Sequence, residues 1–111
     1  MSKVVETIKG VPFHLANHVA YAEGSVVSKT LLKKEAGNIT LFSFAQGQGL
    51  SEHTAPFDAV VYILDGTAQV TIGGKASSVS AGQMLVMPAN IPHALLAEDR
   101  FKMLLVMIRS D

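Results

Sequence analysis

The stretch "AVVYILDGTAQVTIGGKASSVS", residues 59–80, decides the fold class. Its apolar runs 59–65 and 67–72 are separated by Asp65-Gly66, and a third run follows Gly73-Gly74. Both dipeptides tolerate positive φ, as tight hairpin turns require. The runs are rich in valine, isoleucine and threonine, which favour β-strands. This stretch therefore predicts three short strands joined by tight turns.

The same pattern of short apolar runs and turn residues extends over most of the chain. Further short apolar runs lie between turn signals at regular spacing, at 25–32, 39–45, 84–87, 93–97 and 101–108. No long helical period appears after residue 24, so we predict eight or so strands in an all-β sandwich or barrel. Residues 11–22 are the exception, because the spacing of their apolar residues fits a short amphipathic helix.

Size and composition limit the classes of function. A chain of 111 residues has the length of one domain. Nine basic and nine acidic residues cancel, so we expect neither a nucleic-acid partner nor a membrane surface. The chain has no cysteine, which excludes disulfides and thiolate metal sites. Charged residues interrupt the first ten positions, and the longest apolar runs are six residues long, so we expect a cytoplasmic protein.

The apolar content is high for so small a domain, at 49% hydrophobic against 16% charged residues. The run "FKMLLVMI" (101–108) is apolar at both its even and its odd positions over much of its length. A strand that is apolar on both faces must be covered on both faces. We therefore expect a homodimer in which a partner chain covers outer sheet surface. The sandwich core and the N-terminal segment could also provide this cover, and the sequence leaves that alternative open.

Four histidines are the main candidates for chemistry. His14 and His18 have the spacing of zinc helices of the H-E-x-x-H type, but Leu15 stands where that motif has its glutamate. We therefore interpret these two as solvated or capping groups. His53 and His93 each lie beside a proline-bearing turn and next to or within an apolar run.

Three lysines, at positions 29, 33 and 34, form a small basic cluster in the run that begins at residue 25. The simplest interpretation is the exposed face of a strand at the edge of a sheet.

The segments "GLSEHTAPFDAVVYILDG" (49–66) and "GQMLVMPANIPHALLA" (82–97) resemble the two motifs of the cupin superfamily. Those motifs are written G(X)5HXH(X)3-4E(X)6G and G(X)5PXG(X)2H(X)3N. The likeness covers about residues 40–108. It implies a double-stranded β-helix, the jelly-roll barrel of RmlC-like cupins, over residues 25–111. Residues 1–24 would form an N-terminal segment packed outside the barrel.

In the second motif, Gly82, Pro88 and His93 keep the spacing of the family. Asn90 replaces the middle glycine, and asparagine, like glycine, tolerates left-handed backbone. Ala97 stands at the position of the final asparagine.

In the first motif, Gly66 and His53 are in place, and the leading glycine falls on Gly47. The second histidine falls on Ala55 and the glutamate on Ala59. Cupins in general hold a transition metal with three histidines and a glutamate. The resemblance therefore implies a partly lost ligand set of His53 and His93, with a divalent transition metal held only weakly. The candidates for a third donor are Asp58 and Gln48.

The period of two in a strand predicts which side chains share a face. His53 and Ala55 fall on one face, whereas Glu52 points to solvent. Asp58 points away from the pocket if Ala59 points inward, although a bulge at the intervening proline would reverse that assignment. If the register of the resemblance holds, the two imidazoles approach within one metal ion or one water, roughly 3–5 Å.

Two hypotheses of function follow from these residues. In the first, the protein is a small cupin that binds a small molecule in its barrel. The candidate pocket residues are Ala55, Phe57, Ala59, Met84, Met87, Met103 and Met107. A mostly apolar pocket with two polar anchors is the usual form of a ligand site, although methionines are more commonly core filler.

In the second hypothesis the protein is an enzyme. It would be metal-dependent, like dioxygenase and isomerase cupins, or would use His53 and His93 as acid and base. A subunit that acts through protein contacts is a third possibility. Because cupins serve many chemistries, the sequence leaves the ligand unidentified and leaves open whether any reaction is catalysed.

Overall fold

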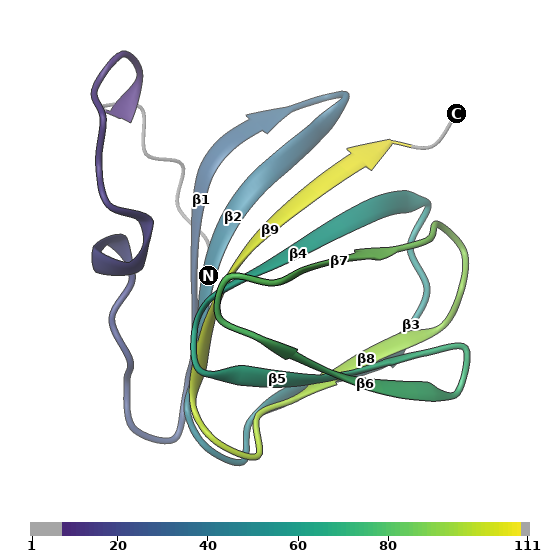
Figure 1. Cartoon of the computed structure of the whole chain (residues 1–111). Helices are drawn as coiled ribbons and strands as arrows, with labels where there is room; N and C mark the ends of the chain where they lie inside the picture. The colour runs from purple at the N-terminus through teal and green to yellow at the C-terminus, as the bar shows by residue number, and fades with distance from the viewer. Residues whose placement is uncertain (1–7, 110–111) are drawn as a thin grey trace.

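The protein is a jelly-roll barrel of two facing β-sheets in a computed structural model that describes residues 8–109 (Figure 1). The elements within these residues are a single short 3-10 turn and nine strands: η2 (Leu15–His18), β1 (Val26–Lys34), β2 (Gly37–Phe44), β3 (Gly49–His53), β4 (Phe57–Asp65), β5 (Thr67–Ile72), β6 (Lys75–Ser80), β7 (Met84–Met87), β8 (His93–Leu96) and β9 (Phe101–Arg109). The all-β prediction is therefore confirmed, and β3 is a strand that the apolar runs did not indicate.

The two sheets divide the strands unequally. The five-stranded sheet has the order β1-β2-β9-β4-β7, and the four-stranded sheet has the order β3-β8-β5-β6. All of the pairings are antiparallel. Between the sheets lies the main core, where the rings of Phe44 and Phe101 stack with their centroids 4.5 Å apart. Met103 and Ile63 are also fully buried there.

The two glycine-containing turns of residues 59–80 have different structural roles: one closes a hairpin and the other connects the two sheets. Gly73-Gly74 closes a hairpin, because Ile72 pairs with Lys75. Asp65-Gly66 does not, since β4 belongs to the five-stranded sheet and β5 to the four-stranded sheet. Gly66, at a φ of 78°, lets the chain turn the corner from one sheet to the other. The hairpin predicted at Asp65-Gly66 is therefore wrong.

The N-terminal segment packs against the outer side of the five-stranded sheet, as expected for a segment outside the barrel (Figure 1). Its buried residue Val19 contacts a second apolar cluster, which includes Leu31 and Leu41. The first seven residues of the expected segment 1–24 lie outside the described part of the chain.

The amphipathic helix expected over residues 11–22 is wrong, because only one 3-10 turn forms there. Side chains of the sheet take up the carbonyl groups that a helix would use. Lys102 Nζ donates to the oxygen of Ala16 at 2.7 Å, and Ser43 Oγ donates to that of Ala20 at 2.8 Å. The Tyr21 hydroxyl donates to Asp65 Oδ2 at 2.5 Å. These bonds hold the segment extended along the barrel.

Strand β9 lies in the middle of the five-stranded sheet, and its two faces are covered differently. Its inward residues Phe101, Met103 and Leu105 belong to the main core. Of its outward residues, Leu104 packs with the N-terminal cluster, whereas Ile108 is 54% exposed. Among residues 8–109, no helix is long and apolar enough to cross a membrane.

Candidate functional site

The two histidines singled out from the sequence lie side by side at one end of the barrel. His53 on β3 and His93 on β8 are direct partners in the antiparallel ladder. Their ring centroids are 4.4 Å apart and the ring planes cross at 66°, edge to face. His93 is buried, with 5% of its surface exposed, and His53 is exposed. The pair therefore connects the interior with solvent.

The same local hydrogen bond orients both rings. The Nδ1 atom of His53 lies 2.8 Å from the carbonyl oxygen of Ser51, and that of His93 lies 3.0 Å from the carbonyl oxygen of Ile91. A carbonyl oxygen can only accept, so each Nδ1 carries the hydrogen. In the neutral ring Nε2 then has the free lone pair. Each imidazole is thus fixed in the tautomer that leaves Nε2 available to a ligand.

The loops beside the histidines are tied together by backbone bonds. Asn90 adopts a φ of 63°, the left-handed backbone that asparagine tolerates at this motif position. The nitrogen of Asn90 donates to the oxygen of Ala55 at 2.8 Å, and that of Ala89 donates to Asp58 Oδ1 at 2.9 Å. The Asp58 carboxylate therefore holds the neighbouring turn and faces away from the pocket.

A cavity of about 50 Å³ lies beside the two histidines. It is lined by Leu50, His53, Ala55, Ala59, Met87, His93, Leu95, Met103, Leu105 and Met107. Five of the seven predicted pocket residues are among these. The three leucines were missed. Leu95 and Leu105 follow the same alternation that pointed Ala59 inward, whereas Leu50 has the opposite parity to His53 and lines the cavity with it because the ladder is irregular between them.

Phe57 and Met84 do not line the cavity. Met84 is 62% exposed on the outer face of β7, three residues from Met87 and so on the opposite side of the strand. Phe57 shares the alternation of Ala59 but stands at the first position of β4. There its ring lies 5.9 Å from the guanidinium of Arg109. Assigning these two residues to the pocket was wrong.

The donor atoms present do not fit a resident transition metal. No group of three or more histidine, cysteine, aspartate or glutamate side chains in residues 8–109 could hold a metal ion. Neither Asp58 nor Gln48 is among the residues that line the cavity, and Glu52 is exposed. Structural and catalytic metal sites usually have at least three protein ligands, whereas this cavity supplies two imidazoles.

His14 and His18 belong to the N-terminal segment and do not line the cavity. The ring of His18 packs on that of Phe13, with centroids 4.3 Å apart, and the carbonyl oxygen of His18 accepts a hydrogen bond from Lys29 Nζ at 3.0 Å. No side-chain bond caps the turn at His14. The bond from Lys29 joins the segment to the sheet.

The fold and the site define the class of protein: a single jelly-roll barrel with a pair of imidazoles beside an apolar cavity. A family model described as a cupin domain matches residues 40–108. The chain belongs to the cupin family. The search of curated proteins found no match.

Solved structures agree with this family. A conserved protein of unknown function from Streptococcus pyogenes is 39% identical, with a TM-score of 0.87, and the match covers 92% of this chain and 90% of that one. A cupin superfamily protein from Desulfitobacterium hafniense is 31% identical, with a TM-score of 0.86 and coverage of 92% and 94%.

A cupin 2 conserved barrel domain protein from Leptotrichia buccalis is 46% identical, with a TM-score of 0.86. That match covers 87% of this chain and 47% of the other, so this chain spans about half the length of the Leptotrichia protein.

Proposed function

We propose that the protein binds a small organic molecule at the mouth of the barrel, with His53 and His93 as its polar anchors. The observation that carries the proposal is the pair of imidazoles beside the apolar cavity, each with Nδ1 bonded to a carbonyl oxygen. A few placed polar groups in a largely apolar pocket are the usual form of a small-molecule site. Each free Nε2 can accept a hydrogen bond from the ligand, or donate one when the ring is protonated.

The lining also suits a pocket that adjusts to its ligand. Met87, Met103 and Met107 contribute unbranched side chains, which reorient more readily than branched ones. The alanines at 55 and 59 leave room where the family motif has larger side chains. A cavity of about 50 Å³ exceeds the space needed by one water but is far below the size of typical ligand pockets. Only part of a ligand therefore enters the cavity.

The alternative of a metal-dependent enzyme is less well supported, because the cavity supplies two imidazoles and no carboxylate. Proton transfer by the same imidazoles would need a bound substrate with an acidic or basic group beside them. Ligand binding is the step that both functions share, so it is the step to test first.

The test is a fragment panel titrated into ¹⁵N-labelled protein and followed by amide chemical shifts. We expect the fragments that bind to shift residues around His53 and His93. His53→Ala and His93→Ala should weaken those shifts while the spectrum keeps its dispersion. His14→Ala is the matched control and should bind like the parent. Shifts confined to other surfaces, or no shifts with any fragment, would contradict the proposal.

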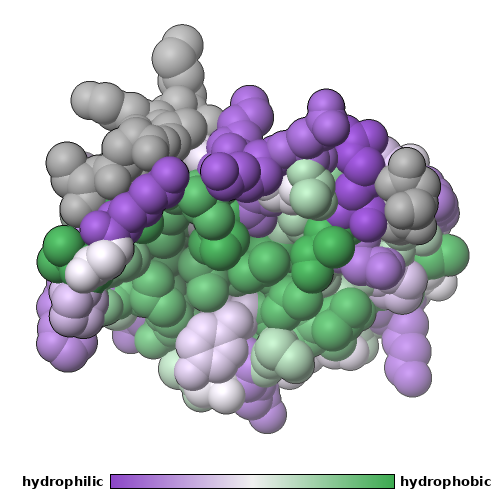
Figure 2. Space-filling model, turned by 90° about the horizontal axis from the view of Figure 1, so that it is seen from above, coloured by the Kyte–Doolittle hydropathy of each residue, from purple (hydrophilic) through white to green (hydrophobic). Residues whose placement is uncertain are grey.

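We also propose that the protein is a homodimer that pairs through the outer side of the five-stranded sheet. Figure 2 shows hydrophobic residues gathered across the middle of one face, over that sheet. Tyr62, Met84, Val86 and Ile108 are exposed there, at 36–62% of their surface. None of the four is charged, so these four residues would bring no like charges together between two copies of the chain.

Sedimentation at micromolar concentration tests this assembly. We expect the parent to sediment at twice 11.8 kDa and Met84→Lys to sediment as the single chain. Val11→Lys is the control, because Val11 is equally apolar and 57% exposed but belongs to the N-terminal segment. A parent that sediments only at 11.8 kDa would exclude the dimer.

A further inference from the structure

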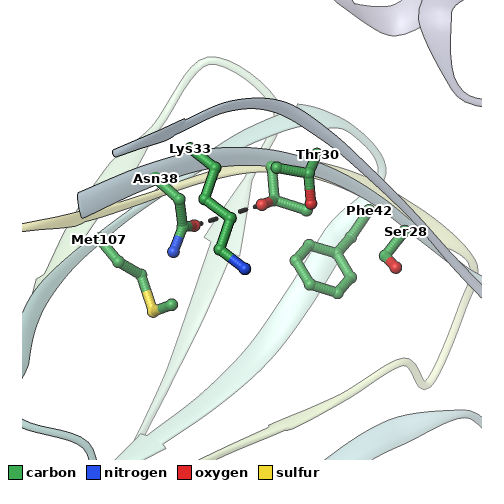
Figure 3. A pocket seen from close by; sticks show the side chains of 7 residues that line it. Ser28, Thr30, Lys33, Asn38, Phe42 and Met107 are labelled. Carbon is green, nitrogen blue, oxygen red and sulfur yellow. Dashed lines mark hydrogen bonds between the residues drawn. The ribbon is translucent and has the colours of Figure 1, made fainter. Parts of the chain in front are cut away.

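A second, more polar hollow opens on the inner side of the five-stranded sheet, at its β1 and β2 edge. Its volume is about 240 Å³, and it is lined by Ser28, Thr30, Lys33, Asn38, Thr40, Phe42 and Met107. No residue of the four-stranded sheet lines it, so this part of the inner face is open to solvent. Figure 3 shows Lys33 and Asn38 extending their nitrogen atoms into the same space, between Met107 and Phe42. We call this hollow the polar groove.

A β-bulge in β1 directs Lys33 into the polar groove. Thr30 pairs with Thr40 and Leu32 pairs with Ile39, so Leu31 is an extra residue in the ladder. Leu31 is buried in the cluster on the outer side of the sheet. Lys33 then pairs with Asn38 and shares its inner face. Bulges commonly redirect a side chain next to a functional site.

The three lysines therefore separate. Without the bulge, Lys33 would alternate with Lys29 and lie on the outer face. Lys29 is on that outer face, where it binds the N-terminal segment through the carbonyl of His18. The interpretation of the three lysines as one exposed strand face is wrong for Lys33.

The polar groove presents hydrogen-bond donors to one place. The hydroxyl of Thr40 donates to Asn38 Oδ1 at 3.3 Å, which leaves the NH₂ group of Asn38 free to face the groove. Lys33 Nζ carries a positive charge, and no aspartate or glutamate is among the residues that line the groove or the histidine cavity. An ammonium and an amide NH₂ in a groove whose lining holds no carboxylate are suited to an anionic oxygen ligand, such as a carboxylate.

The polar groove and the histidine cavity lie along one row of paired residues. The row runs Lys33, Asn38, Met107, Ala59 and Met87 across all five strands. Met107 lines both hollows. Two strand spacings separate Asn38 from Ala59, so the carboxylate position lies about 10 Å from the cavity wall. The groove also has room for the part of a ligand that the small cavity excludes.

We propose that the polar groove is the carboxylate subsite of the ligand that His53 and His93 anchor, and that this ligand is an amphiphilic organic acid. Its carboxylate binds Lys33 and Asn38, its apolar body passes over Met107 to the cavity, and a polar group at its far end binds the imidazoles. The inference rests on the proposed function, since it assigns the chemical class of the molecule bound there.

The experiment titrates octanoate and its neutral analogue octanamide into the ¹⁵N-labelled full chain. We expect octanoate to shift residues of both the groove and the cavity, and to bind at least tenfold more tightly than octanamide. Lys33→Gln should weaken octanoate binding about tenfold, the effect of one charge-assisted hydrogen bond, and leave octanamide unchanged. Lys34→Gln is the control, because it removes the same charge from the next exposed residue.

The outcomes separate the two proposals. Octanoate and octanamide shifting the cavity equally would overturn the carboxylate subsite and leave the proposed function standing. Octanoate shifting the groove alone would overturn the single ligand that spans both hollows. If Lys33→Gln and Lys34→Gln weaken octanoate binding equally, the loss of affinity follows from net charge alone, and the role of Lys33 is overturned. Shifts in neither hollow would overturn both proposals.

Discussion

Substituting Gly66 by alanine tests the corner where the chain passes from one sheet to the other. Gly66 has a φ of 78°, and a Cβ added to it would lie 2.3 Å from the carbonyl oxygen of Arg100 and 3.1 Å from Cα of Phe101. Phe101 is fully buried and stacks on Phe44, so its backbone cannot move without disturbing the core. The clash adds to the strain of the left-handed backbone.

The expected cost has two parts. Left-handed backbone costs a non-glycine residue about 1–2 kcal/mol. Forcing a methyl group into packed structure costs about 1–3 kcal/mol more. Gly74→Ala is the matched control, because Gly74 has a φ of 84° but no atom within 4 Å of an added Cβ. We expect Gly66→Ala to lower the free energy of unfolding by about 2–5 kcal/mol, and Gly74→Ala by about 1–2 kcal/mol.

Urea unfolding followed by far-UV circular dichroism measures both variants against the parent. The slope with urea should stay constant, so that the shift in midpoint reports stability alone. Equal losses for the two variants would refute the reasoning, since the contact with Arg100 and Phe101 would then contribute nothing.

Two further predictions concern Tyr21 and the two alanines of the cavity. Burial, and then the hydrogen bond to Asp65, raise the pKa of Tyr21 above its ordinary value of 10.0, so the folded chain holds this proton more tightly than the unfolded chain. The contribution of Tyr21 to the free energy of unfolding should therefore be complete below about pH 10 and be lost above it. Urea unfolding at a series of pH values measures this loss. Tyr21→Phe should cost about 1 kcal/mol at neutral pH and make that fall less steep, and an unchanged alkaline profile would contradict this. Ala55→His with Ala59→Glu should add two donors to the imidazole pair, so Zn²⁺ at a hundred times its Kd should stabilise this variant by about 2.7 kcal/mol in calorimetry. The single variants are the controls, and a double variant that does not respond to metal would show that the four positions do not converge.

Much of the barrel could be predicted from the sequence because its signal is local. Alternating apolar residues and glycine turns indicated every strand except β3. That strand, "GLSEH", is exposed at four of its five positions and has no apolar alternation to detect. It is a strand because its backbone pairs with β8, a contact that is distant in sequence. The N-terminal helix failed for a related reason, since side chains from distant strands take its carbonyl groups.

The candidate site divides in the same way. The motif spacing predicted that His53 and His93 lie together and that Ala55 and Ala59 share one cavity with them. The polar groove was missed, because the face on which Lys33 lies depends on the bulge at Leu31, and period-two counting assumes an unbroken ladder. The interpretation of Met84 as a pocket residue overlooked that residues three apart in a strand, such as Met84 and Met87, point to opposite faces.

The bulge at Leu31 also bears on how barrels of this kind could diverge. The bulge consists of one extra residue, so deleting that residue would leave Thr30 paired with Thr40 and Leu32 with Ile39, and the lysine would still face the polar groove. A barrel that keeps the residue but pairs it in a regular ladder would instead turn every later side chain of β1 to the opposite face, and the ammonium group would leave the groove. Such a change removes no motif residue and alters no imidazole. Two barrels with identical motifs and strands of equal length could therefore differ in whether they accept an anionic ligand.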